Sequence, residues 1–142
     1  MTFDLSQEVV TRAAIIRGCA RALKPVLSNP RLALSKKLSL VKAHIFASGL
    51  FQCSTWGPLS TPLYSKTHAA VVQVYRIATK HVFNPASVNF IFSDADLISE
   101  YGLVSPMVMI RQSRLSLSAR LAAKSPRCVL DLLKVFWDRD CG

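Results

Sequence analysis

Acidic residues are scarce in this 142-residue chain, which contains 8 Asp and Glu against 18 Lys and Arg and carries a net charge of +10 at pH 7. Between Glu8 and Asp94 the sequence contains no carboxylate at all. Two-metal phosphoryl transfer and glycoside hydrolysis both require paired acids, so more than half of the chain can supply neither chemistry. We therefore expect no catalytic residue and no enzymatic activity from the chain on its own.

The sequence also lacks metal-ligand spacing and a long uninterrupted hydrophobic run. The four cysteines include no Cys-x-x-Cys pair and the three histidines do not complete a ligand set, so we expect no zinc site and no cofactor. The most apolar stretch, residues 38–56, is interrupted by Lys42, His44 and Gln52, which favours a buried helix over a membrane span. No secretory leader is recognised, so the expected location is intracellular, nuclear or cytoplasmic, with reduced thiols.

The dominant feature of the sequence is positive charge that no nearby negative charge compensates. The acid-free stretch carries eleven cations, which are Arg12, Arg17, Arg21, Lys24, Arg31, Lys36, Lys37, Lys42, Lys66, Arg76 and Lys80. A solvated helix surface usually mixes acids and bases at i, i+4, and this stretch cannot do so. A polyanion is the natural partner of such a charge distribution, and nucleic acid is the commonest one.

Hydrophobic spacing at alternating steps of three and four predicts an all-α bundle of about six helices, joined by short connections marked by Pro and Gly. The expected helices cover residues 7–24, 30–53, 62–83, 93–101, 106–124 and a last segment that opens at Pro126. Residues 1–83 would form a basic three-helix part. Residues 84–142 would form a helical part packed on it, within one compact unit.

Several residues mark helix ends in the first half of the chain. Pro25 should bend or end the first helix near Lys24. Asn29 followed by Pro30 is an N-cap signal for the second helix. The C-terminal half of that second helix is apolar nearly all round, which predicts a place at the centre of the bundle.

The C-terminal helices carry signals of the same kind. Ser93 and Asp96 have capping-box spacing at the start of a short helix, and Gly102 suits the left-handed position after its end. The buried face of the last helix is expected from four apolar residues, Val129, Leu132, Leu133 and Phe136.

Arg114 is a cation predicted on an apolar stripe, together with Met107, Ile110, Leu117 and Leu121. A cation in that position must either pair with an acid or lie at the boundary between two faces of its helix. Glu100 is a candidate partner.

Two helix faces are the best candidates for phosphate contacts. Three cations of the first helix follow i, i+4, i+7 spacing, and three more share a face of the third helix. The second helix adds two lysines, although its cations do not all fall on one face. The candidate nucleic-acid-binding residues are Arg17, Arg21, Lys24, Lys36, Lys37, Lys66, Arg76 and Lys80. Because Trp56, Tyr64 and Tyr75 are expected in the core or at a turn, we predict backbone contact rather than reading of base sequence.

A series of short motifs runs in order along nearly the whole chain. The motifs are Glu8-Val9-Val10-x-Arg12, Leu34-Ser35-x-Lys37-Leu38-x-Leu40, Thr55-Trp56, Val74-Tyr75-Arg76, Asp96-Leu97-Ile98 and Gly102-Leu103-x-Ser105-Pro106. In this order they resemble the thumb and post-palm region of the reverse transcriptases of non-LTR retrotransposons, which are RNA-directed DNA polymerases. The catalytic palm of that family carries a Tyr-x-Asp-Asp-like pair, and this chain has no Asp-Asp pair.

The resemblance implies a non-catalytic fragment whose basic helices close over a primer–template duplex. It implies two partners, the backbone of RNA or DNA and the palm portion of a polymerase that this chain does not contain. No membrane partner is expected, because the most apolar stretch is interrupted by polar residues.

Two further functions stay open on the sequence. A helical protein–protein interaction module with no nucleic-acid role would scatter the cations and leave an apolar patch bare. A small hydrolase would need Asp94, Asp96 and a histidine around one pocket, with a nucleophile within hydrogen-bond reach.

Overall fold

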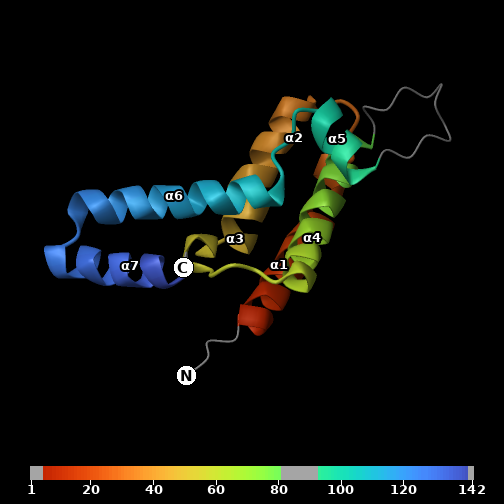
Figure 1. The fold of residues 1–142 in the computed structure, drawn as a ribbon. Coiled ribbons are helices and arrows are strands. Elements are labelled where there is room, and N and C mark those ends of the chain that lie inside the picture. Colours follow the sequence, from red (N-terminus) through yellow and green to blue (C-terminus); the bar gives the residue numbers. More distant parts are fainter. Residues whose placement is uncertain (1–4, 81–92, 141–142) are drawn as a thin grey trace.

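The computed structural model describes residues 5–80 and 93–140, and all regular structure within these ranges is helical (Figure 1). The elements are α1 (Leu5–Leu27), α2 (Leu34–Leu40), η1 (Val41–Phe46), α3 (Ala47–Gly49), η2 (Cys53–Thr55), α4 (Thr61–Thr79), α5 (Asp94–Glu100), α6 (Pro106–Lys124) and α7 (Arg127–Asp140). The predicted all-α architecture is confirmed. The predicted end of the third helix near Phe83 lies outside the described residues, as does almost all of the connector expected at 85–93.

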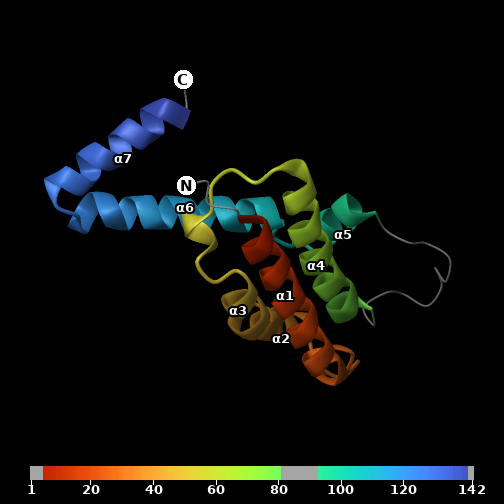
Figure 2. The same cartoon turned by 90° about the horizontal axis from the view of Figure 1, so that it is seen from below.

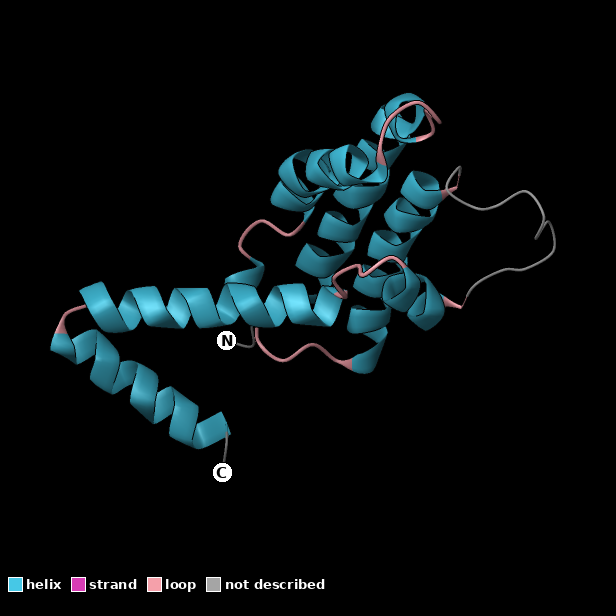
Figure 3. Cartoon of the chain, turned by 90° about the horizontal axis from the view of Figure 1, so that it is seen from above, coloured by secondary structure: helices cyan, strands magenta, loops and turns pink. Residues whose placement is uncertain are grey.

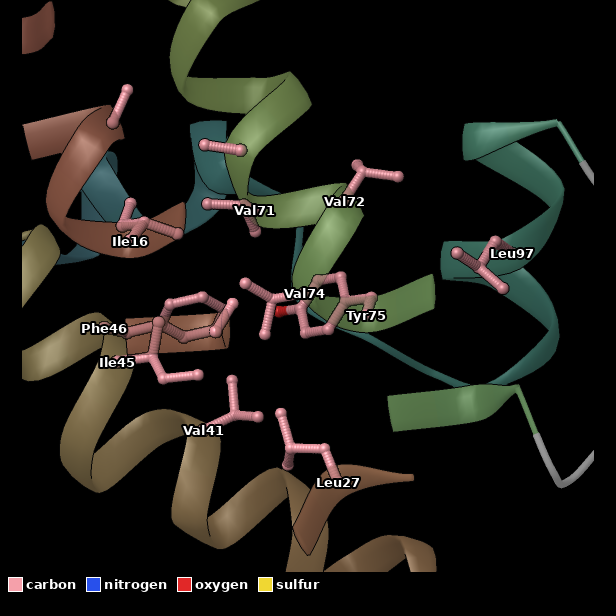
Figure 4. Close-up of a cluster of buried hydrophobic side chains, with 13 residues drawn as sticks. Ile16, Leu27, Val41, Ile45, Phe46, Val71, Val72, Val74, Tyr75 and Leu97 are labelled. Carbon is pink, nitrogen blue, oxygen red and sulfur yellow. The ribbon is translucent and has the colours of Figure 1, made fainter. Parts of the chain in front are cut away.

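Helices α1 and α4 lie side by side and run in the same direction (Figures 1 and 2). The α2–η1–α3 segment returns along α1 in the opposite direction and closes the core. Side chains from these three layers and from α5 meet in one hydrophobic cluster (Figure 4). Its largest fully buried members include Ile16, Leu27, Ile45, Val74 and Leu97. The short helix α5 is therefore part of the same core as α1 and α4.

A second, smaller cluster attaches α6 to the bundle. Val9 of α1, Cys53 of η2, Trp56 and Ile110 of α6 are all buried together. Beyond this contact α6 projects from the bundle and α7 turns back beside it, so the two form an extended hairpin (Figure 3). Val129 and Leu132 of α7 are 38% and 61% exposed, so the prediction that they face a core is wrong. The side chains of Leu133 and Phe136 lie outside the described set.

The second helix differs from its prediction in both its start and its surroundings. It begins at Leu34, because Asn29 closes a local turn in which its Oδ1 accepts a hydrogen bond of 2.9 Å from the Arg31 backbone N–H. Its middle, Val41–Phe46, is a turn of π-helix. Val41, Ile45 and Phe46 are buried, but the opposite side of the segment is exposed, so it does not occupy the centre of the bundle.

The predicted end of the first helix near Lys24 is wrong, because helix α1 continues through Pro25 to Leu27, with the proline exposed. Two predicted features of α5 are observed. The Ser93 hydroxyl caps α5, accepting from the Asp96 N–H at 3.2 Å and donating to Asp96 Oδ2 at 2.6 Å. Gly102 takes φ +58° and Leu103 N–H returns to the Ile98 carbonyl at 2.8 Å, which confirms the glycine-terminated helix end.

Two glycines with opposite surroundings test the packing of α3 on α1. A Cβ added at Gly49 would overlap the buried side chain of Ile16, whereas a Cβ added at Gly18 would meet no atom within 4 Å. We expect Gly49→Ala to lower the free energy of unfolding by about 2–3 kcal/mol through overpacking. Gly18→Ala, in the exposed middle of α1, should raise it by about 0.5–1 kcal/mol. Urea denaturation of both variants measures this, and equal effects would contradict the packing described.

Candidate nucleic-acid interface

The basic face predicted on the first helix lies on the surface. Arg17, Arg21 and Lys24 of α1 are exposed, while Ala13 and Ala20 on the adjoining face are buried. At 100° per residue, the three cations lie on one flank of the buried stripe. Their alignment along α1 places three positive charges in a row.

Arg12 lies on the opposite flank of α1, and its contacts show which element packs against that flank. Its Nη1 donates to the Ser48 carbonyl at 3.1 Å, and its guanidinium lies 5.5 Å from the ring centroid of Phe51. Its Nε donates to Glu8 Oε1 at 2.7 Å. Arg12 therefore faces the α3 side of α1. The Arg17–Arg21–Lys24 face is turned away from α3, on the flank next to α4.

Helix α4 and the residue directly after it contribute two exposed lysines to the same region. Lys66 and Lys80 are fourteen residues apart, close to four turns, and are both exposed, with exposed Gln73 midway between them. Because α1 and α4 run in the same direction, Lys24 and Lys80 lie at the same end of the helix pair (Figure 2). Five of the eight predicted residues are thus exposed on two neighbouring helices. Lys36 is also exposed, near the start of α2.

Lys37 does not belong to any surface face, so its assignment as a phosphate contact is corrected. Its side chain is 1% exposed, and its Nζ donates to the Ala78 carbonyl at 3.4 Å. Ala78 lies in the last turn of α4, where carbonyl groups need donors from outside the helix and positive charge is favoured. Lys37 therefore caps α4 from α2, a role that no sequence pattern indicates.

Arg76 is also unavailable as a phosphate contact, because it pairs with an acid. Its Nη2 donates to Asp94 Oδ1 at 2.6 Å, and His68 Nε2 lies 3.4 Å from Asp94 Oδ2. The hydrogen bond from Arg76 is the main cause that holds the pKa of Asp94 below its usual value, and partial burial of the carboxyl opposes it. This pairing joins the last part of α4 to the first residue of α5.

The hydrolase arrangement is not assembled around these acids. Asp94 faces Arg76 and His68, whereas Asp96 accepts the hydrogen bond from the Ser93 hydroxyl. The two carboxylates therefore serve different partners. Within the described ranges, no group of three or more His, Cys, Asp or Glu residues is placed to hold a metal ion.

Arg114 pairs with backbone rather than with the candidate Glu100. Its Nη2 donates to the Trp56 carbonyl at 2.6 Å and also to the Gly57 carbonyl. The indole of Trp56 is buried beside Ile110, so Arg114 fastens the loop before α4 to α6. Sequence periodicity left open whether Arg114 pairs with an acid or lies at a boundary between faces, and could not identify a carbonyl acceptor.

Eight of the eleven cations of the acid-free stretch take part in none of these pairings and are exposed. They are Arg17, Arg21, Lys24, Arg31, Lys36, Lys42, Lys66 and Lys80. None of the eight forms an ion pair with a carboxylate in the described part of the chain. Trp56 and Tyr75 are buried, as predicted, and Tyr64 is partly buried with its ring 5.8 Å from that of His68.

Comparisons of the chain with protein-family models, with curated proteins and with solved structures find no match. Among the described helices, none combines the length and apolar character needed to cross a membrane.

The capping role of Lys37 leads to a stability prediction. Lys37→Met keeps most of the buried stem but removes the donor to Ala78, so we expect the free energy of unfolding to fall by about 1–2 kcal/mol. The matched control is Lys36→Met, which removes the same charge from an exposed neighbour and should change stability by less than about 0.5 kcal/mol. Thermal and urea unfolding measure both variants. A Lys37→Met variant as stable as the control would contradict the cap.

The Asp94 pair leads to a pH prediction. Because the folded-state pKa of Asp94 is lowered, its stabilising contribution is present above the usual carboxyl value of 3.8 and is lost as the pH falls through the folded-state pKa. Asp94→Asn should therefore cost about 0.5 kcal/mol at pH 7, since the pair is half exposed, and less at pH 2.5. Urea unfolding at the two pH values measures this, with Glu100→Gln as the control for charge. A cost that stays constant with pH would exclude the ion pair as its source.

Proposed function

We propose that the protein binds the phosphate backbone of nucleic acid through the exposed faces of α1 and α4, with Arg17, Arg21, Lys24, Lys66 and Lys80 as contacts. The observation that carries the proposal is the exposure of these five cations on two adjacent helices within a stretch of sequence that offers no carboxylate. Released counterions would supply the binding free energy. With the aromatic rings Trp56 and Tyr75 buried, the proposal includes no reading of base sequence.

The dimensions of the two faces suit several successive phosphates. Lys66 and Lys80 are separated by about 21 Å along α4, at 1.5 Å per residue. Phosphates of one strand recur about every 3.4 Å along a duplex axis. The paired faces are therefore long enough for about five phosphate contacts, one for each cation.

The ordered motifs that resemble the thumb region of retroelement reverse transcriptases support the same proposal. In that family the thumb closes over the primer–template duplex, so a basic helical fragment would keep the contact without the chemistry. The proposal therefore assigns the chain no catalytic step. It names the palm portion of such a polymerase as a protein partner.

Salt dependence tests the proposal directly. Binding to a mixed-sequence 20-base-pair DNA duplex, measured by fluorescence anisotropy at stepped salt concentrations, should give a slope of log affinity against log salt of about −4 to −5. Arg17→Gln and Arg21→Gln should each reduce the magnitude of the slope by about 0.9 and weaken binding equally on duplexes of different sequence.

The control for this experiment is Lys124→Gln, which removes one exposed positive charge from the far end of α6. It should leave the slope unchanged. No binding at low salt by a folded protein, or equal effects of Lys124→Gln and Arg17→Gln, would reject the interface. The second outcome would indicate attraction by net charge alone.

A protein–protein interaction module is the second candidate, and one observation favours it. Leu115 of α6 and Leu132 and Val135 of α7 are 68%, 61% and 63% exposed on the projecting hairpin. Exposed apolar faces of this kind often mark interaction surfaces. Concentration-dependent sedimentation that Leu132→Glu abolishes, together with no duplex binding at low salt, would favour this function over the first.

A further inference from the structure

A cavity of about 610 Å³ lies between the α2–η1–α3 segment and α6, where its lining extends from Met109 to Arg120. Sites for small ligands typically have volumes of roughly 300–1,000 Å³ and mainly apolar walls. The apolar lining of this cavity includes Leu38, Val41, Phe46, Leu50, Leu103 and Met109. None of its lining residues comes from the basic faces of α1 and α4, so the cavity is a separate feature of the molecule.

The polar lining of the cavity is positively charged. Lys42 of η1 and Arg120 of α6 both line it and are exposed. Gln112, Ser113 and Ser116 add neutral hydrogen-bonding groups from α6. No described residue that lines the cavity is acidic. The charge complementarity therefore favours a ligand with an anionic group at one end and an apolar body.

Two contacts of Tyr75 hold part of the cavity wall in place. The rings of Phe46 and Tyr75, both labelled in Figure 4, meet edge to face with centroids 5.6 Å apart. The Tyr75 hydroxyl donates to the Val104 carbonyl at 2.8 Å, which joins α4 to the loop before α6. Burial raises the pKa of Tyr75 to about 12, so the hydroxyl keeps its proton and the hydrogen bond. A preformed apolar wall lowers the entropic cost of binding.

Two irregular backbone segments contribute residues to this cavity. The π-helical turn Val41–Phe46 supplies Val41, Lys42 and Phe46, and single π-helical turns are frequent at functional sites. Gln52 lines the cavity with φ +60°, the one non-glycine residue with positive φ among those described. Unfavourable backbone conformations of this kind concentrate at ligand sites. The π-helical turn, the positive φ of Gln52 and the positive charge are therefore all found at the same cavity.

We propose that this cavity binds a free long-chain carboxylate, with the hydrocarbon tail against Phe46, Leu50 and Met109 and the carboxylate between Lys42 and Arg120. The proposal does not depend on nucleic-acid binding, because it uses different residues. It involves no covalent step.

Isothermal titration calorimetry with sodium dodecanoate, below its critical micelle concentration, tests the proposal. We expect one saturable site per chain. Lys42→Gln and Arg120→Gln should each raise Kd about tenfold through the loss of one charged contact. Neutral dodecanol should bind the wild type, Lys42→Gln and Arg120→Gln with the same Kd. Ser116→Phe, at an exposed position that lines the cavity, should abolish binding of both ligands by filling the space.

Arg111→Gln is the matched control, because Arg111 is an exposed cation of α6 that does not line the cavity. It should leave Kd for dodecanoate unchanged. Three results would overturn the proposal: no saturable binding of dodecanoate, an equal effect of Arg111→Gln and Arg120→Gln, or binding to phosphatidylglycerol vesicles without binding to monomeric dodecanoate. Circular dichroism of each variant verifies that the helices are intact.

Discussion

Direct packing of α1 against α4 is the contact on which the rest of the structure depends. Small buried residues, Ala13 and Ala20 on α1 and Ala70 and Ala78 on α4, belong to the helices with the most extensive mutual contact. Small side chains allow two helix axes to approach closely along their length. Because the two helices are parallel, no tight turn can join them, and the α2–η1–α3 segment makes the connection. That segment buries one side in the core, and Val41 and Phe46 on that side also line the cavity beside α6.

The shortage of acids changes how this fold holds its cations. Lys37, Arg12 and Arg114 each donate to a backbone carbonyl of another element. Carbonyl oxygens in loops and helix ends lack intrahelical donors and so can accept from a cation, although Arg12 also pairs with the Glu8 carboxylate. Internal cations thus join α2 to α4, α1 to α3 and α6 to the loop before α4. The remaining exposed cations are left for contacts outside the molecule, which is the basis of the proposed interface.

Local sequence patterns predicted the features that depend on local physics. Periodicity and capping residues gave the all-α class, the Ser93 cap and the left-handed Gly102, because these depend on residues within one or two turns. The same patterns failed where tertiary contacts decide. A lysine in a basic run carries no sign that it will be buried, as Lys37 is. The pattern of an amphipathic helix identifies an apolar face but not the element that packs against it. For this reason the pattern predicted a buried Leu132, which is exposed. Likewise, no spacing rule predicts the carbonyl partners of Arg114.

The parallel arrangement of α1 and α4 also determines the order in which the chain can fold during synthesis. Helix α1 is complete at Leu27, but its main partner starts only at Thr61 and is finished at Thr79. At ribosomal elongation rates this interval lasts on the order of seconds. During that time the apolar stripe of α1 has only the α2–η1–α3 segment for cover. A nascent chain of this protein therefore passes through a stage with one hydrophobic stripe partly open, when binding by a chaperone would protect it from aggregation.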